Sequence, residues 1–397
     1  MKQKKNPNIK LAEPENLEKL KKAARKRKRD KAKKWSITFV LAVMIIGGTY
    51  LLVNNQAYTK VREAAKYEDE TSDTNRYAQF ADGIIRYSRD GVVFLNRKNE
   101  EQWIQPCQMQ NPAIDVNENT FAVADSGGNS ILVFTEEGLK GEMETTLPIE
   151  KMSVSDQGIV SVILKNENSP MIVSYDATGN ILVEHQVTVN STGYPLALDM
   201  SRDGMTLAVS YLYTKDGALK SKVAYYNFGE AGKAKTDNQV SMEEYDGKII
   251  PEVYFMDDAT SVAVSDSSFI VYEGKDAPQK KKEVKLNQEI KSVFHTDKYI
   301  GFVLLNKGKS GYEARLYNKS GKQIMNKAFT GEYSNIKMVE DEIIMFAGSK
   351  CCIITKNGVQ RFKGDLKAEA LEVIPTRGVN RYLVMSANEL RVVYLTK

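Results

Sequence analysis

The stretch Ile149–Val189 decides the fold and reads IEKMSVSDQGIVSVILKNENSPMIVSYDATGNILVEHQVTV. It contains four runs in which apolar and polar residues alternate, separated by Gly, Asn and Asp, which is the pattern of β-strands joined by tight turns. The predicted strands are IEKMSVS, GIVSVILK, MIVSYDA and NILVEHQVTV. A second copy in the same frame occupies Glu289–Thr330. The chain therefore repeats a four-stranded unit.

Weaker copies of this unit fill most of the remaining chain. They begin near Tyr77, Asn111, Tyr194, Ile250, Glu332 and Ala368. A period of about 35–42 residues is typical of the four-stranded blades of a β-propeller. We therefore expect an all-β fold, a seven- or eight-bladed β-propeller with four-stranded antiparallel blades over residues 76–397. An irregular β-sandwich or two β-domains is the alternative, but neither produces a fixed period of this length.

The last unit, Ala370–Lys397, shows three strands and lacks an outermost one. A propeller must close, so that no long strand edge is left to pair with other chains. We expect the segment Tyr77–Phe80 to supply the missing strand, and the assignment of that strand decides between seven and eight blades.

Upstream of the repeats, Trp35–Val53 reads WSITFVLAVMIIGGTYLLV, which is free of charge. A helix of this length spans roughly 28 Å, close to the hydrocarbon thickness of a bilayer. The alternative is a cleaved signal peptide, but its apolar region is usually shorter and is followed by small residues at the cut. The following VNNQAYTK offers no such site. We predict an uncleaved transmembrane signal-anchor helix with boundaries at Trp35 and Val53.

Charge is distributed unevenly on the two sides of this segment. Residues 1–34 carry 15 Lys and Arg and four acidic residues, a net charge of +11, and the whole chain carries +5, so the remainder carries −6. Basic residues beside a span stay on the cytoplasmic side. We expect a single-pass protein of the cell membrane with a cytoplasmic N-terminus, a juxtamembrane stalk or short helix over 54–75, and an extracellular propeller.

The basic tail of residues 1–34 is expected to form a helix from about Pro14 and to rest on the anionic headgroups of the lipid bilayer. Docking of a cytoplasmic partner or a nucleic acid is the alternative, but a charge run beside a membrane needs no partner, and we expect no nucleic acid.

The unit that begins near Tyr194 is longer than the others, near 50 residues. Its excess includes Asp216-Gly217, which predicts the tip of an extended hairpin. Insertions of this kind often carry function. The aromatic residues beside it form a possible partner-binding hairpin: Tyr211, Tyr213, Tyr225, Tyr226 and Phe228. Alternatively, these side chains pack the two faces of the hairpin.

The sequence assigns no catalytic, cofactor-binding or metal-binding residue. His185 and His295 lie in different repeats on predicted strands, and no Walker loop, nucleophile elbow or zinc spacing occurs. Asp115–Asn119 has the D-x-N-x-N spacing of a calcium loop, but the sixth position is Thr120 and the twelfth is not Glu, so an Asn- and Asp-rich turn explains it equally well. Carboxylates from distant blades remain possible catalysts, because they leave no local motif.

Three turn phrases resemble the repeat of quinoprotein-type propellers: FLNRKNEEQW at Phe94–Trp103, SYDATGNILVEH and LYNKSGKQIM. The resemblance implies a blade pattern. Quinoprotein dehydrogenases also carry adjacent cysteines, like Cys351 and Cys352 here. The comparison fails beyond this, because the domain has one tryptophan where that repeat supplies one per blade, and no residues match that family's cofactor or metal positions. In the strand-like SKCCIITKNG the two cysteines are interpreted as small apolar core or rim residues. Together with Cys107 they are too few for a disulfide framework.

As a whole, the chain resembles a family of uncharacterised clostridial envelope proteins. The phrases LAVSYLYTKDG and KSKVAYYNFGEAGK carry this resemblance. It implies a basic cytoplasmic tail, one span and a propeller-like exterior domain, and it implies no activity.

Two functions follow as hypotheses. The first is a non-catalytic binding or scaffold module for an envelope protein or glycan, which needs no cofactor. The second is a carboxylate-dependent hydrolase or lyase that acts on cell-envelope polysaccharide at the central channel. Two carboxylates about 5–10 Å apart in a groove would favour the enzyme, and an aromatic or apolar patch would favour binding.

Overall fold

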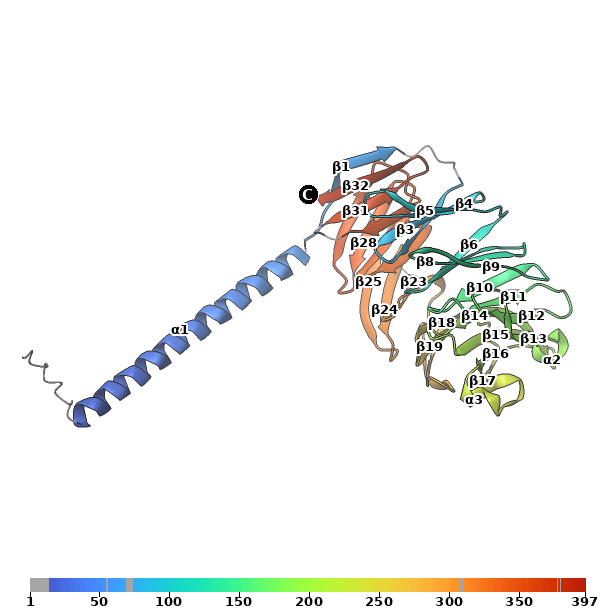
Figure 1. Ribbon diagram of the computed structural model, residues 1–397, viewed down its shortest axis with the longest axis horizontal. Coiled ribbons are helices and arrows are strands. Elements are labelled where there is room, and N and C mark those ends of the chain that lie inside the picture. The colour runs from blue at the N-terminus through green and yellow to red at the C-terminus, as the bar shows by residue number, and fades with distance from the viewer. Residues whose placement is uncertain (1–13, 55, 69–73, 307–309, 377, 379) are drawn as a thin grey trace, which may run out of the picture. The chain divides into compact units, whose positions relative to one another are not determined.

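The computed structural model describes residues 14–54, 56–68, 74–306, 310–376, 378 and 380–397. The chain divides into two compact units, residues 1–56 and 57–397. The first contains the helix α1, and the second contains the β-strands (Figure 1).

The first unit is a single helix, α1 (Pro14–Asn54), of 41 residues. At about 1.5 Å per residue it is roughly 62 Å long. It begins at Pro14, as the sequence predicts, because proline is well tolerated in the first turn, where the backbone N–H has no partner. The part Lys22–Thr49 has the length and hydropathy of a helix that can cross a membrane, and the window that meets these criteria is not buried.

The second unit is a β-propeller of eight four-stranded sheets, as the repeat predicts (Figure 1). In seven sheets, four strands consecutive in the chain pair antiparallel in chain order. The first strand of each is the innermost one, which lines the central channel, and the fourth is the outermost. We number the blades in chain order from β2.

The first four blades have the following strands. Blade 1 contains β2 (Arg76–Phe80), β3 (Gly83–Tyr87), β4 (Gly91–Leu95) and β5 (Glu101–Pro106). Blade 2 contains β6 (Pro112–Val116), β7 (Phe121–Asp125), β8 (Ser130–Thr135) and β9 (Gly138–Glu144). Blade 3 contains β10 (Ile149–Val154), β11 (Val160–Leu164), β12 (Met171–Tyr175) and β13 (Ile181–Gln186). Blade 4 contains β14 (Tyr194–Met200), β15 (Thr206–Lys215), β16 (Ala218–Asn227) and β17 (Gln239–Asp246).

The last four blades follow the same plan, except at the closure. Blade 5 contains β18 (Glu252–Asp257), β19 (Thr260–Val264), β20 (Ser268–Glu273) and β21 (Gln279–Lys285). Blade 6 contains β22 (Ile290–His295), β23 (Tyr299–Leu305), β24 (Tyr312–Asn318) and β25 (Gln323–Phe329). Blade 7 contains β26 (Asn335–Val339), β27 (Glu342–Ala347), β28 (Lys350–Thr355) and β29 (Gln360–Asp365). Blade 8 contains β30 (Glu372–Pro375), β31 (Arg381–Met385), β32 (Glu389–Thr396) and β1 (Lys60–Glu68).

The antiparallel order places two kinds of loop on opposite faces of the ring. The turns between the first and second strands, and between the third and fourth, lie on one face, which we call the turn face. The turns between the second and third strands lie on the other face together with the links from one blade to the next, and we call this the connection face.

The core lies between the blades. The second strands of blades 2 and 3, β7 and β11, are buried along their whole length. Eight apolar clusters are found among the described residues, and each joins two neighbouring blades, from blades 1 and 2 to blades 8 and 1. Because each blade buries both faces against its neighbours, the hydrophobic effect stabilises the ring as a whole.

The ring is closed by a strand from before the first blade. Strand β1 pairs antiparallel with β32, from Lys60 opposite Thr396 to Glu68 opposite Glu389 (Figure 1). Just before it, the backbone N–H of Tyr58 donates to the carbonyl of Arg361 on blade 7, at 2.8 Å. Residues 58–68 therefore fasten blade 8 to blade 7 as well as completing blade 8.

Two predictions about this region are wrong. Residues 60–68, predicted to lie within a stalk, form the outermost strand of blade 8. The segment Tyr77–Phe80, predicted to close the ring, is the innermost strand of blade 1. The physical reason is exposure: of the nine residues of β1 only Val61 is buried, so the strand lacks the apolar alternation by which a strand is recognised in a sequence.

The long unit forms blade 4. Strands β15 and β16 are ten residues each, and they meet at Asp216-Gly217, where both residues have positive φ angles of 55° and 74°, as a tight hairpin turn requires. A short helix α3 (Glu230–Lys233) and a 3-10 turn η1 (Thr236–Asn238) lie between β16 and β17, and a helix α2 (Val189–Thr192) precedes β14. The predicted extended hairpin is confirmed.

Candidate functional site

A groove of about 710 Å³ lies between blades 6 and 7, and we call it the blade 6–7 groove. The innermost strands β22 and β26 and the outer strands β24 and β25 contribute to its walls. The link between the two blades, residues 330–334, borders it on the connection face. It is lined by Lys291, Ser292, Val303, Tyr312, Phe329, Gly331, Glu332, Tyr333, Ser334, Ile336 and Ala347.

Three aromatic rings form one wall of the groove. Tyr312 and Phe329 are directly opposite each other on β24 and β25, and their rings stack with centroids 5.7 Å apart and an interplanar angle of 27°. The ring of Tyr333 lies 6.1 Å from that of Phe329. Gly331, at φ +109°, lets the link pass close to this ring, because a Cβ there would lie 2.9 Å from the Tyr333 hydroxyl. Tyr312 and Tyr333 are half-buried, and Phe329 is buried.

Polar groups of both signs border these rings. The ammonium of Lys291 donates to a carboxylate oxygen of Glu289 at 2.6 Å, and this bond raises the lysine pKa. Burial raises the pKa of Tyr333, and the adjacent Cys352 thiol adds to the effect. Glu332 is exposed. The groove therefore offers hydrogen-bond donors and acceptors, and its charged lining residues are the paired cation Lys291 and the exposed carboxylate Glu332.

A smaller cavity of about 220 Å³ lies at the channel near the turn face. Blades 2 to 6 contribute to its lining through their innermost strands and the following turns. It is lined by Asp115, Val116, Asn117, Val154, Asp199, Met200, Arg202, Phe255, His295, Thr296 and Asp297.

Two aspartates in this cavity form three hydrogen bonds to neighbouring blades. A carboxylate oxygen of Asp115 accepts a hydrogen bond from the backbone N–H of Val154 on the next blade, at 2.7 Å. Asp199 accepts one from the N–H of Phe255, at 2.5 Å, and one from the hydroxyl of Ser153, at 2.7 Å. Each carboxylate thus accepts an N–H that would otherwise be unpaired at a blade junction.

The same two carboxyl groups have perturbed acidities. Burial raises the pKa of Asp115, against the hydrogen bonds that it accepts. Burial and the neighbouring Asp115 carboxylate together raise the pKa of Asp199 to about 7. A raised pKa beside a cavity marks a possible functional site, but inter-blade hydrogen bonding of this kind produces the same signature.

His295 also faces the channel, from β22. Its ring stacks on that of Tyr254 from the neighbouring blade, with centroids 3.9 Å apart. Part of the His295 side chain is accessible to solvent, but protein atoms surround the ring closely. The resulting desolvation lowers the pKa of the imidazole to about 4. The imidazole is therefore neutral at physiological pH. Tyr254 in turn donates a hydrogen bond to Glu252 at 2.5 Å.

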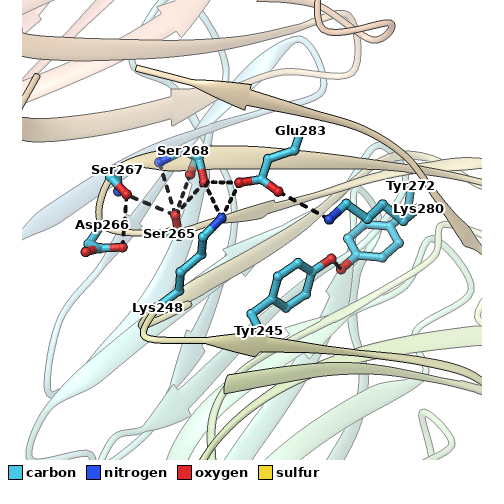
Figure 2. A network of polar contacts seen from close by, with 9 residues as sticks. All are labelled: Tyr245, Lys248, Ser265, Asp266, Ser267, Ser268, Tyr272, Lys280 and Glu283. Atoms are coloured by element: carbon cyan, nitrogen blue, oxygen red, sulfur yellow. Dashed lines mark hydrogen bonds and ion pairs between the residues drawn. The ribbon is translucent and has the colours of Figure 1, made fainter. Parts of the chain in front are cut away.

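A third polar cluster ties blade 4 to blade 5 on the connection face (Figure 2). The Lys248 ammonium forms an ion pair with Glu283, and Lys280 reaches the other oxygen of this carboxylate at 3.2 Å. These two lysines lower the Glu283 pKa to about 2, Lys248 having the larger effect. Tyr245 and Tyr272 share a hydrogen bond of 2.6 Å below them. Lys248, Lys280 and Glu283 are paired with one another, so we interpret the cluster as structural.

The predicted partner-binding hairpin is mostly buried. Tyr211, Tyr225 and Tyr226 are 1%, 1% and 7% exposed and form part of the core between blades. The hydroxyls of Tyr211 and Tyr226 are 2.8 Å apart, in a mutual hydrogen bond. These three side chains cannot present a binding surface, and the alternative, packing, is correct for them. Tyr213 and Phe228 are partly exposed, and Phe228 lines a cavity of about 620 Å³ between blades 3 and 4.

The other residues that the sequence singled out lie on strands or turns. Cys351 and Cys352 are fully buried on β28 and point into two different clusters on opposite faces of the blade, so they serve as core residues. His185, on β13, lines the cavity between blades 3 and 4. Asn117 in the calcium-like stretch donates to the carbonyl of Val154, as part of a turn. No cluster of three or more His, Cys, Asp or Glu that could hold a metal occurs among the described residues.

Sequence reasoning missed the blade 6–7 groove. Its aromatic residues come from three separate segments, β24, the end of β25 and the link that follows, and they form no motif. The one available signal was the phrase FTGEYS at Phe329–Ser334, where two aromatic residues flank a glycine in a link between blades.

Comparison with known proteins agrees with the propeller fold. Sqt1 of Saccharomyces cerevisiae is similar over 84% of this chain and 99% of its own, at 10% identity and a TM-score of 0.56. BamB of Moraxella catarrhalis is similar over 85% of this chain and 100% of its own, at 14% identity and a TM-score of 0.49. No curated protein matches the chain. Residues 54–395 match DUF5711, described as a family of unknown function, and the chain belongs to this family.

Proposed function

We propose that this protein is a membrane-anchored binding module whose extracellular propeller holds an envelope protein or glycan in the blade 6–7 groove. The groove carries the proposal. At about 710 Å³ it has the size of a ligand pocket, and it combines aromatic rings with a few polar groups, as such pockets do.

The helix α1 supports the anchoring part of the proposal. It joins a strongly basic segment to an apolar segment of bilayer length without a break, which favours a cytoplasmic N-terminus and a single span. Three residues of sequence lie between the end of α1 at Asn54 and Tyr58, whose backbone N–H donates to blade 7. A short tether keeps a binding module at high local concentration near its membrane.

Site-specific photocrosslinking in intact cells tests the proposal. A benzophenone amino acid replaces Tyr312 in the groove in one variant, and Tyr67, 40% exposed on β1, in the control. We expect an adduct of protein or glycan from position 312 and none from position 67. No adduct from position 312, or the same adduct from both positions, would refute binding in the groove.

The alternative is a hydrolase or lyase that uses Asp115 and Asp199 at the channel. The raised pKa of both carboxyl groups beside a cavity favours it. Incubation of the full chain with cell-envelope polysaccharide separates the two functions. Turnover that Asp199→Asn abolishes would support the enzyme, and absence of turnover by the native protein would exclude it for that substrate.

A further inference from the structure

We infer that the ligand of the blade 6–7 groove is a neutral oligosaccharide, held by stacking on the aromatic wall. This inference rests on the proposed function, because it names the chemical class that the same groove selects.

The aromatic wall presents rings at the right depth for stacking. Phe329 is 7% exposed, while Tyr312 and Tyr333 are half-buried beside it and reach the groove with part of their surface. One face of a pyranose ring carries mainly C–H groups and packs on the face of an aromatic ring. Such contacts are directional, like other aromatic contacts, because the ring face is electron-rich.

The polar groups match hydroxyl groups better than they match charges. Lys291 is already paired with Glu289, at 2.6 Å, so its charge is balanced. Ser334 is exposed and Ser292 is half-buried at the groove, and each hydroxyl can both donate and accept. A strongly anionic polymer would need unpaired cations, which the described lining does not supply.

The aliphatic lining of the groove is small: Val303 is buried, and Ile336 and Ala347 are half-buried. The three aromatic rings are therefore the main apolar surface that a ligand can contact. The lining residues extend from the innermost strands β22 and β26 to the outermost strand β25, so a chain of sugar rings can lie along the groove.

The full chain in lipid nanodiscs is titrated with chitotetraose, cellotetraose and mannotetraose by calorimetry. We expect saturable binding of at least one of the three. Tyr312→Ala should weaken this binding about tenfold, the loss expected for one stacked ring, whereas Tyr312→Phe should retain it within about threefold because the ring remains. The control Tyr67→Ala alters an exposed tyrosine on β1 and should bind like the native protein.

Two results would overturn the inference: no saturable binding of any of the three sugars, or equal loss in Tyr312→Ala and Tyr67→Ala. Crosslinking at position 312 separates failure of the carbohydrate inference from failure of the proposed binding site. A protein adduct at that position without sugar binding would refute the carbohydrate while leaving the groove as a binding site. Neither an adduct nor sugar binding would refute both.

Discussion

The hydroxyl of Ser153, on the innermost strand of blade 3, donates a hydrogen bond of 2.7 Å to the carboxylate of Asp199 on the innermost strand of blade 4. The same hydroxyl accepts the backbone N–H of Met200 at 3.1 Å. Together with Asp115, whose carboxylate accepts an N–H from blade 3, these bonds form a polar belt around one side of the channel. The belt includes two buried carboxyl groups, Asp115 and Asp199, so the stability of the folded protein depends on their protonation.

The free energy of unfolding of the protein should fall as the pH rises from about 4 to about 7, because Asp199 loses its proton over this range. The pKa of Asp199 is about 7 in the folded protein, against the ordinary aspartate value of 3.8 that applies to the unfolded chain. Between these values the folded state retains the proton and the unfolded state does not, so the stabilisation is complete below about pH 4 and is lost through pH 7. Urea unfolding at several pH values, compared with Asp199→Asn, measures it. The native protein should lose of order 1–3 kcal/mol more than the variant between about pH 5 and pH 8.

The comparison with the Asn variant is needed because other groups titrate in the same range. Asparagine can accept the Phe255 N–H through its side-chain oxygen, and its NH2 group can donate to the Ser153 hydroxyl, so it replaces the protonated carboxyl group without a charge. Identical pH profiles for the native protein and Asp199→Asn would show that this carboxyl group titrates normally.

The closing strand should be sensitive to a charge at its one buried position. Val61 on β1 is 6% exposed and faces the core between blades 7 and 8. Val61→Asp should destabilise the protein by ~3 kcal/mol or more, because it buries an unpaired charge. Release of β1 would also leave β32 as a free edge, which promotes aggregation. Denaturant unfolding and light scattering measure the two effects.

Ala64→Asp is the matched control, because it introduces the same residue at an exposed position of the same strand. It should change the free energy of unfolding by less than about 0.5 kcal/mol. Equal destabilisation by both variants would argue that β1 does not close the ring in the way described.

The tyrosine pair in blade 4 should show energetic coupling. Tyr211 and Tyr226 are buried, and each hydroxyl satisfies the other. Replacing either one with Phe leaves a buried hydroxyl without its partner and should cost about 1–2 kcal/mol. The double variant should cost less than the sum of the two, because it removes both polar groups. A double-mutant cycle by denaturant unfolding tests this, and additive losses would contradict it.

Membrane topology can be measured with single cysteines. In a Cys107→Ser background, Asp216→Cys places a thiol at the exposed tip of the blade 4 hairpin, and Lys22→Cys places one in the basic part of α1. A membrane-impermeant maleimide should label the hairpin variant in intact cells and the helix variant only after lysis. The reverse pattern would place the propeller in the cytoplasm. Cys351 and Cys352 should add no background, because both are fully buried.

The fold could be predicted from the sequence because apolar strands recur at a regular spacing along the chain. The second strand of blade 3, Val160–Leu164, is buried at every position, and the recurrence of such strands in other blades indicates the architecture. Strand β1 could not be recognised in this way. Its Glu63, Ala64 and Lys66 are exposed, and a sequence of this kind suits a helix as well as an outer strand.

The candidate site was less predictable than the fold. The rings of Tyr312 and Tyr333 both contact Phe329, one through sheet register and the other through a link between blades, and no local sequence pattern indicates this. Conversely, the tyrosines of blade 4 are close in sequence and suggest a surface patch. In the structure, Tyr211 lies on one face of the blade and Tyr225 on the other, and neighbouring blades cover both faces. Aromatic density alone cannot separate a core from a surface.

The pairing of β1 with β32 has a consequence for biogenesis. The ribosome makes residues 60–68 before any blade and residues 389–396 after all the others, so the earliest strand must wait for the latest one. A chain that stops short of its final strand leaves this early segment without a pairing partner, and the ring stays open. Closure of the ring therefore depends on completion of the chain, through the single pair formed by β1 and β32.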